Sequence, residues 1–293
     1  MPIDAIAGTS AGALVGAFFL AGRLDLIEAL TRQLDWRKTA RLLLDVGLPR
    51  GGLLSGRNME RLLQDLLPVR HVEALDRPFA AVATDLRTHQ EVVIRSGDLI
   101  PAIRASLSIP VIFTPVERNG RLLVDGALVN PLPVSVVRDL GADFVIAVDV
   151  NLRQGQGQVR TKPDPSSRLS GDHAQSPANL VKRLRQYIPA LPEPPAALEN
   201  LFKKWQPRRH ALTIFDVLTQ STRIFENQIT RHRLATDPPD ILIQPAVGDL
   251  FTLDFPRASA AIAAGVDATR EQHAQLEALF SRLGRDAGAE DDG

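Results

Sequence analysis

The hydrophobic and polar positions of the chain follow two different spacings. Short apolar runs bounded by turn residues predict strands at 3–7, 79–84, 91–95, 121–125, 144–150 and 241–244. Longer stretches with helical spacing predict helices at 25–34, 37–45, 57–67, 98–107, 133–139, 216–235 and 257–285. Helices that lie between mostly apolar strands are typical of α/β proteins. We therefore predict a three-layer α/β/α fold with a mostly parallel central sheet.

The longest uncharged stretch, residues 5–22, has the length at which a membrane-spanning helix has to be considered. A secretion signal needs positive charge ahead of its apolar part, but the charged residue here is Asp4. Four glycines together with Thr9 and Ser10 disfavour a spanning helix, and the first residues are better interpreted as a buried strand. We therefore expect a strand, a sharp turn and an apolar helix.

The turn contains the sequence Gly8-Thr9-Ser10-Ala11-Gly12, which fits the pattern G-x-S-x-G. In this pattern the small residues let the strand and the helix approach each other, and the serine hydroxyl is lifted out of the sheet. The unpaired N–H groups and the dipole of the following helix favour negative charge beside that hydroxyl. Ser10 is therefore a candidate nucleophile.

A nucleophilic serine needs a base, because its hydroxyl is hardly ionised at neutral pH. None of the histidines has surroundings that single it out, and we interpret each as a solvated surface residue; they are His71, His89, His173, His210, His232 and His273. The stronger candidate is Asp125, which closes the strand "RLLVD" directly before Gly126. Ligands of open α/β sheets bind at the carboxyl ends of strands, although an Asx-type turn would also explain this aspartate.

These two segments together resemble the patatin-like phospholipases, serine acyl hydrolases that use a Ser-Asp dyad without histidine. The resemblance rests on "GTSAGAL" followed by "DGALVNPLP", and it extends to "ATDL", "AIRASLSIPVIFTPV", "LGADFVIAVDVN" and "DPPDILIQP". It implies that Ser10 is the nucleophile and Asp125 the base. The surrounding motif residues would shape the two turns, with the Ala11 N–H as an oxyanion donor; they are Gly8, Thr9, Ala11, Gly12, Gly126 and Ala127.

The chemistry that this resemblance implies is hydrolysis of a phospholipid or lysophospholipid ester through an acyl-enzyme. Asp125 would need a raised pKa to act as a base, and its apolar neighbours Leu122, Leu123, Val124 and Ala127 could provide it. Two alternatives remain open. A Ser-His-Asp hydrolase would require His232 or His273. A non-catalytic member would bind lipid or a protein partner without needing Ser10.

One departure from the family concerns the oxyanion hole. Family members carry a strand and a loop similar to G-G-G-x-R-G ahead of the serine motif, whereas Met1 stands nine residues before Ser10. The cluster "PRGGLLSGRN" at 49–58 is interpreted as a loop and a helix start. Oxyanion donors are commonly worth about 10²- to 10³-fold each in rate. A start codon placed too far downstream, a truncated chain and a natural pseudoenzyme would each explain the departure, and we favour the first.

The composition of the chain excludes several classes of partner and of chemistry. Lys plus Arg equals Asp plus Glu at 34 each, so no global field favours nucleic acid, and the absence of cysteine excludes disulfides and thiol chemistry. No metal or cofactor motif is present. We expect one domain over 1–285 with a polar, basic insertion at 153–210 and a disordered acidic tail at 286–293. We expect a cytoplasmic protein, with basic and apolar residues of 182–209 as its candidate contact with a membrane surface.

Overall fold

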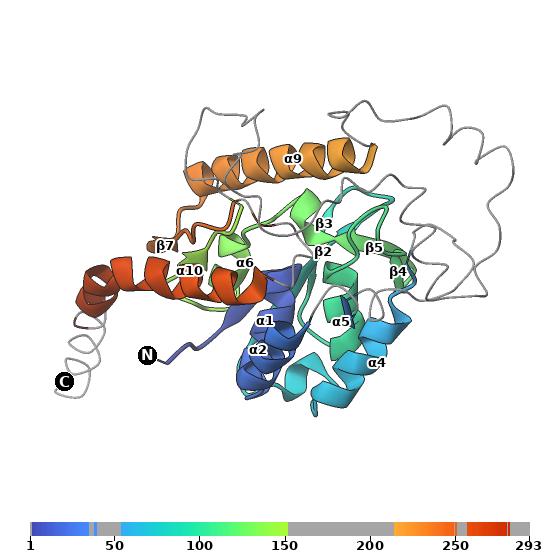
Figure 1. Ribbon diagram of the computed structural model, residues 1–293, viewed down its shortest axis with the longest axis horizontal. Coiled ribbons are helices and arrows are strands. Elements are labelled where there is room, and N and C mark those ends of the chain that lie inside the picture. Colours follow the sequence, from blue (N-terminus) through green and yellow to red (C-terminus); the bar gives the residue numbers. More distant parts are fainter. Residues whose placement is uncertain are drawn as a thin grey trace, which may run out of the picture. The chain divides into compact units, whose positions relative to one another are not determined.

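The computed structural model describes residues 2–34, 38–39, 54–151, 214–248, 250, 257–279 and 281 (Figure 1). The chain divides into two compact units, one made of residues 1–154 and 222–293, the other of residues 155–221. The first unit holds all the strands named below. The predicted insertion at 153–210, its membrane contact at 182–209 and the tail at 286–293 lie outside the described residues, as does most of the helix predicted at 37–45.

Seven strands are described, and five of them form one sheet. These five are β1 (Ile6–Thr9), β2 (Phe79–Asp85), β3 (Glu91–Ile94), β4 (Val116–Arg118) and β5 (Arg121–Asp125). Strand β2 pairs with β1 in parallel and with β3 and β5 in antiparallel fashion, and β4 pairs antiparallel with β5. A second sheet consists of the parallel strands β6 (Ile146–Val148) and β7 (Ile241–Ile243).

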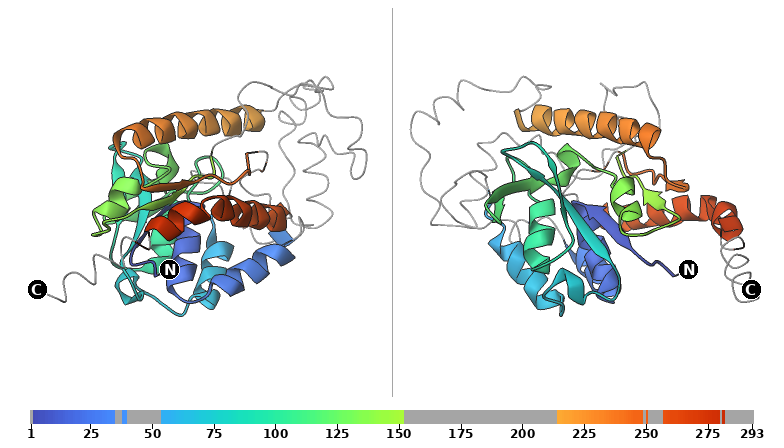
Figure 2. Two further views of the ribbon diagram at one scale, coloured as in Figure 1. Left: turned by 90° about the vertical axis from the view of Figure 1, so that its left-hand side faces the viewer. Right: turned by 180° about the vertical axis from the view of Figure 1, so that it is seen from behind.

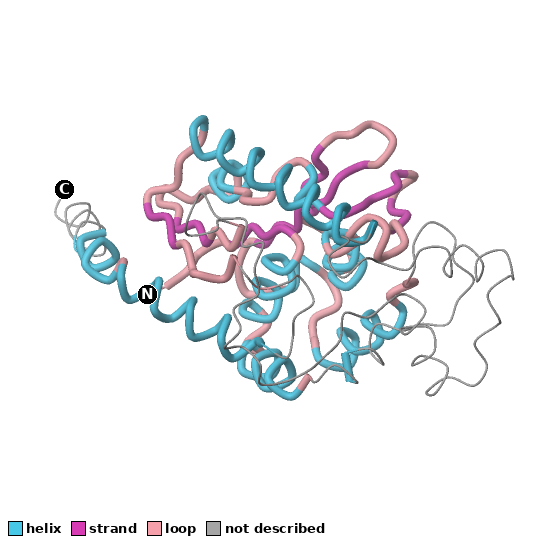
Figure 3. The backbone as a smooth tube through the Cα atoms, turned by 45° about the horizontal axis from the view of Figure 1, so that its top comes forward, coloured by secondary structure: helices cyan, strands magenta, loops and turns pink. Residues whose placement is uncertain are grey.

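The described pairing is mixed, which corrects the prediction of a mostly parallel sheet. Two of the five described pairings are parallel and three are antiparallel. Parallel neighbours need a crossover connection of a dozen or more residues, whereas the β2–β3 and β4–β5 connections are short. Strands β4 and β5 are joined by Asn119 and Gly120, both with positive φ, as a tight two-residue hairpin requires. Figure 3 shows these short loops joining neighbouring strands.

Helices cover both faces of the larger sheet, which confirms the three-layer α/β/α prediction. Strand β2 is buried along its whole length, and successive side chains point to opposite faces. Phe79, Ala81 and Ala83 pack in one cluster with residues of α1 (Ala11–Leu20), α4 (Arg57–Leu66) and α5 (Leu99–Ser106). Ala80 and Val82 pack on the other face with Val136 of α6 (Val134–Arg138). Figures 1 and 2 show these layers from three sides.

The remaining helices are α2 (Leu24–Gln33), α9 (Ile214–Thr236) and α10 (Ala258–Glu271), with short 3₁₀ turns η1 (Val72–Ala74) and η2 (Gly126–Leu128). Strand β7 packs against α10, where Ile241 and Ile243 share a cluster with Ala268. The predicted helices at 25–34, 57–67, 98–107, 133–139 and 216–235 are confirmed to within two residues at each end. Among the described residues, no helix combines the length and the apolar character needed to cross a lipid bilayer.

Candidate active site

Ser10 occupies the sharp turn between β1 and α1, as the G-x-S-x-G pattern predicts. Its backbone has φ 54° and ψ −121°, a region that residues with a side chain rarely adopt. Such a conformation costs about 1–3 kcal/mol and persists where the surroundings impose it. Ala11 is the first residue of α1, so its N–H has no acceptor within the helix.

The two glycines of the motif are not equivalent. A Cβ atom added to Gly8 would lie 2.4 Å from the backbone nitrogen of Ala13 and 2.4 Å from the carbonyl carbon of Gly12. A Cβ atom added to Gly12 would meet nothing within 4 Å. Of the two motif glycines, only Gly8 is therefore required for the close approach of strand and helix.

Hydrogen bonds to distant parts of the chain hold this turn in place. The Ser10 N–H donates to the Ser106 Oγ at 2.8 Å, and the Ser106 hydroxyl donates to the Val82 carbonyl at 2.6 Å. The Thr9 hydroxyl donates to the Asn130 carbonyl at 2.7 Å. The first two bonds connect the turn through α5 to β2, and the third connects it to the loop that follows η2.

Asp125 lies at the end of β5 and is 4% exposed. Its carboxylate accepts a hydrogen bond from the Ala127 N–H at 2.9 Å, and the Ser10 hydroxyl lies close enough to lower its pKa. The structure therefore places the predicted nucleophile beside the predicted base. The bond to Ala127 makes Asp125 the cap of an Asx-type turn, as the alternative interpretation of this residue predicts.

Burial raises the pKa of Asp125 from 3.8 to about 6, and the Ala127 N–H and the Ser10 hydroxyl oppose that shift. Desolvation disfavours the charged form of a carboxyl group, which makes the carboxylate a stronger proton acceptor. A general base works best when its pKa lies near the operating pH. The raised pKa therefore suits the role that the sequence predicts.

Gly126 lets the Asp125 turn lie directly on β2. A Cβ atom added to Gly126 would come within 2.3 Å of the Val82 carbonyl oxygen, the same atom that accepts the Ser106 hydroxyl. The turn at Ser10 and the turn at Asp125 thus converge on one peptide group of β2.

Glu226 of α9 is a further ionisable residue near Asp125. Its pKa is raised to about 7, first by burial and second by the negative charge of Asp125, while Arg223 opposes the shift. Arg233, seven residues further along α9, lies on the same side of the helix and pairs with Glu91 at 3.1 Å. Arg233 also donates to the Val129 carbonyl at 3.1 Å, which fixes α9 beside the loop after η2. Sequence patterns do not single out Glu226, since α9 carries several charged residues.

The described histidines do not replace Asp125 as partners of Ser10. His71 pairs with Asp98, and His273 pairs with Glu277 on the surface of the protein. His89 and His232 are exposed, while His173 and His210 lie outside the described residues. In the described part of the chain, no group of three or more His, Asp or Glu side chains is arranged to hold a metal ion.

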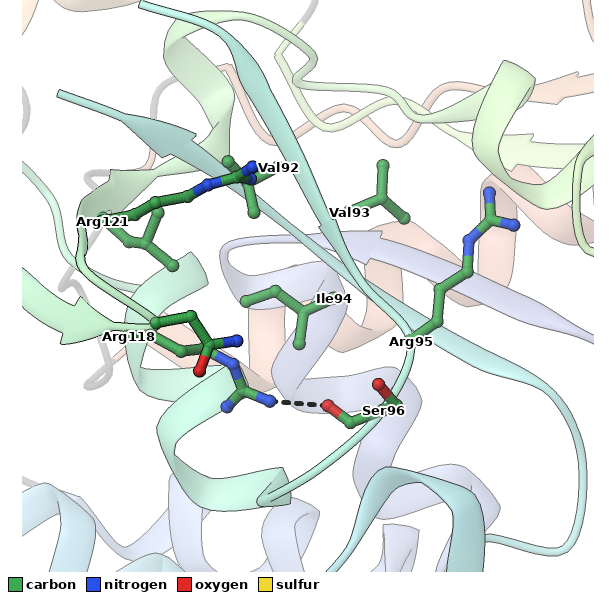
Figure 4. Close-up of a pocket in the computed structure, with 9 residues that line it drawn as sticks. Val92, Val93, Ile94, Arg95, Ser96, Arg118 and Arg121 are labelled. Atoms are coloured by element: carbon green, nitrogen blue, oxygen red, sulfur yellow. Dashed lines mark hydrogen bonds between the residues drawn. The ribbon is translucent and has the colours of Figure 1, made fainter. Parts of the chain in front are cut away.

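A pocket of about 310 Å³ lies elsewhere, between β3 and the β4–β5 hairpin (Figure 4). Its walls include Ile94, Leu123 and three arginines, but neither Ser10 nor Asp125. The Arg118 guanidinium donates to the Ser96 carbonyl at 2.6 Å, and Arg95 pairs with Asp139. The pocket is therefore separate from the candidate active site.

Comparisons with known proteins identify similar sequences, and the matched family region includes both turns. A family model described as patatin-like phospholipase matches residues 1–138. An uncharacterized NTE family protein of Mycobacterium tuberculosis is 30% identical over 294 residues, which cover 90% of this chain and 81% of that protein. Patatin-like phospholipase domain-containing protein 7 of Mus musculus is 33% identical over 159 residues, which cover 52% of this chain and 12% of that protein.

Proposed function

Since the chain belongs to the patatin-like phospholipase family, we propose that it hydrolyses a carboxylic ester of a phospholipid or lysophospholipid, with Ser10 as nucleophile and Asp125 as base. The observation that carries the proposal is the proximity of the Ser10 hydroxyl to the buried Asp125 carboxylate, whose raised pKa this hydroxyl partly offsets. A nucleophile within hydrogen-bond reach of its base is the arrangement that covalent catalysis requires.

The reaction proceeds in two steps. Asp125 takes the Ser10 proton as the Ser10 oxygen attacks the ester carbonyl, and protonated Asp125 then returns the proton to the leaving alcohol. Water next donates a proton to Asp125 while it attacks the acyl-enzyme. The carboxylic acid is released when Ser10 leaves and takes the proton back from Asp125, so both residues return to their initial states.

The developing oxyanion needs donors that are already in place. The Ala11 N–H is the donor that we assign, because it lies next to the nucleophile at the start of α1. The positive end of the α1 dipole adds to this stabilisation. The active site as proposed uses no metal or cofactor.

A fluorophosphonate probe tests the proposal on the full chain. We expect an adduct on Ser10, located by mass spectrometry, which is lost in Ser10→Ala. Asp125→Asn should label at least about 10²-fold more slowly, because it removes the general base. Asp98→Asn changes an exposed carboxylate on another loop and should label at the wild-type rate.

The other functions predict different outcomes. A Ser-His-Asp hydrolase would lose labelling in His232→Gln or His273→Gln, which the Ser-Asp mechanism does not require. A non-catalytic member would show no adduct although circular dichroism reports a folded chain. Either result would refute the proposed mechanism.

A further inference from the structure

Ser106 is the last residue of α5 and its side chain is fully buried. It does not contact the Asp125 carboxylate, and no solvent reaches it. A role in binding substrate is therefore excluded by its position. Its hydroxyl nevertheless joins the turn at Ser10 to the central strand β2.

The Val82 carbonyl determines the direction of both hydrogen bonds that the Ser106 hydroxyl makes. The Val82 carbonyl can only accept, so the single hydrogen of the Ser106 hydroxyl is committed to Val82. The Ser106 oxygen is then left as an acceptor, and the Ser10 N–H donates to it at 2.8 Å. This arrangement cannot reverse while Val82 remains in place, so the Ser10 amide has one fixed acceptor.

That amide belongs to the residue with the positive φ angle. Rotating the Thr9–Ser10 peptide toward a relaxed conformation would move the Ser10 N–H away from Ser106 and leave a buried donor unpaired. The bond therefore opposes relaxation of the turn. Gly126 lies against the same Val82 carbonyl, so the atom that orients Ser106 also supports the turn that carries Asp125.

We propose that Ser106 is a positioning residue, whose hydroxyl holds the backbone of Ser10 in the strained conformation that directs the Ser10 hydroxyl to Asp125. The inference rests on the proposed function for its effect on the rate, and on the hydrogen bonds alone for its effect on the turn. Each part has its own measurement.

The kinetic test compares variants that differ in the hydroxyl. Ser106→Ala should lower kcat for ester hydrolysis and the rate of fluorophosphonate labelling by about 10- to 100-fold, since small misplacements of reacting groups have effects of this size. KM should stay unchanged, because Ser106 does not reach the substrate. Ser106→Thr retains the hydroxyl and should recover part of the rate, whereas Ser106→Cys, with a weak sulfur acceptor, should recover less.

A matched control separates positioning from general loss of stability. Val145→Ala removes buried atoms from a different hydrophobic cluster and should label at the wild-type rate. Wild-type labelling in folded Ser106→Ala would overturn the kinetic part. Absence of labelling in the wild-type chain would instead overturn the proposed function.

Amide exchange of Ser10, followed by NMR, tests the structural part without requiring activity. The Ser10 N–H should exchange at least about tenfold faster in Ser106→Ala than in the wild type, because it loses its acceptor. Ser106→Thr should preserve the protection. Unchanged exchange in Ser106→Ala would overturn the inference whether or not the chain is active.

Discussion

The turn at Ser10 and the turn at Asp125 rest on the same carbonyl of β2, but different contributions to the free energy of folding oppose their formation. The Ser10 turn holds a residue with φ 54° and requires Gly8 for close packing, so its cost is conformational. The Asp125 residue adopts ordinary negative φ, but it buries a carboxylate, so its cost is electrostatic. One half of the site should therefore respond to changes in volume and backbone freedom, and the other half to pH and charge.

The comparison also explains how the two turns are stabilised. Ser10 is held by the bond from its backbone N–H to the Ser106 hydroxyl and by the neighbouring bond from the Thr9 hydroxyl to the Asn130 carbonyl. Asp125 is held by its own side chain, which accepts a hydrogen bond from the Ala127 N–H. Substitutions at the two turns can thus be chosen to affect one kind of cost at a time.

The largest expected effect is a difference in stability between alanine substitutions at the two glycines of the serine motif. Gly8→Ala should destabilise the protein by about 3 kcal/mol or more, because the new Cβ meets rigid backbone. Gly12→Ala should instead stabilise it by about 0.4–1 kcal/mol, since the site is open and helical. Urea unfolding of both variants measures this difference. Equal effects of the two substitutions would contradict the conformational explanation.

Removing the charge of Asp125 should stabilise the protein, whereas Gly8→Ala should destabilise it. The folded-state pKa of about 6 exceeds the ordinary value of 3.8, so burying the ionised group lowers stability fully above pH 6; this penalty declines as the pH falls from 6 and is absent below 3.8. Asp125→Asn should therefore raise the free energy of unfolding by up to roughly 3 kcal/mol at pH 8, and by much less near pH 4. Unfolding curves at both pH values test this, and a gain independent of pH would contradict it.

The same carboxylate should control the pH dependence of labelling. Only ionised Asp125 accepts the Ser10 proton, so the fluorophosphonate rate should fall about tenfold per pH unit below a midpoint near 6. Rates measured between pH 4.5 and 8 on wild type and on Ser106→Ala should share this midpoint, because Ser106 does not contact the carboxylate. A rate that stays level down to pH 4.5 would contradict the raised pKa of the carboxylate.

The smallest expected effect concerns Glu226. Burial and the charge of Asp125 raise its pKa to about 7, with Arg223 opposing, so ionisation above neutral pH adds a negative charge near Asp125. Such a charge disfavours a transition state that is itself negatively charged. Wild-type labelling should decline by a few-fold above pH 7, and Glu226→Gln should remove the decline. Glu277→Gln, at an exposed position, serves as the control. An unchanged decline in Glu226→Gln would assign it to another group.

Much of this arrangement can be predicted from the sequence. The turn at Ser10 and the strand end at Asp125 are encoded locally, by glycines and by an apolar run followed by Asp-Gly, and the family resemblance based on them is confirmed. The catalytic roles of both residues remain predictions. The strand β4 is not predicted, because its three residues include two charged side chains and provide too short a pattern.

Ser106, Glu226 and the direction of the strands depend on contacts between distant segments. A serine at a helix end and a glutamate on a charged helix have no local signature, so only the fold shows that one meets Ser10 and the other approaches Asp125. Apolar strands with helices between them predict a parallel sheet. The antiparallel pairing of β2 with β5 joins two hairpins, β2–β3 and β4–β5, and the local sequence does not show that these hairpins pair with each other.

The hydrogen bonds that hold the Ser10 turn span large separations in the sequence, 96 residues to Ser106 and 121 residues to Asn130. During synthesis at about 5–20 residues per second, the turn therefore waits on the order of 6–25 seconds before its last partner is made. Until β2 has been made, the apolar helix α1, with Phe18 and Leu20 among its core residues, cannot pack on the β1–β2 pair. The site is consequently completed late in folding, after β2, α5 and the loop that follows η2 have been made.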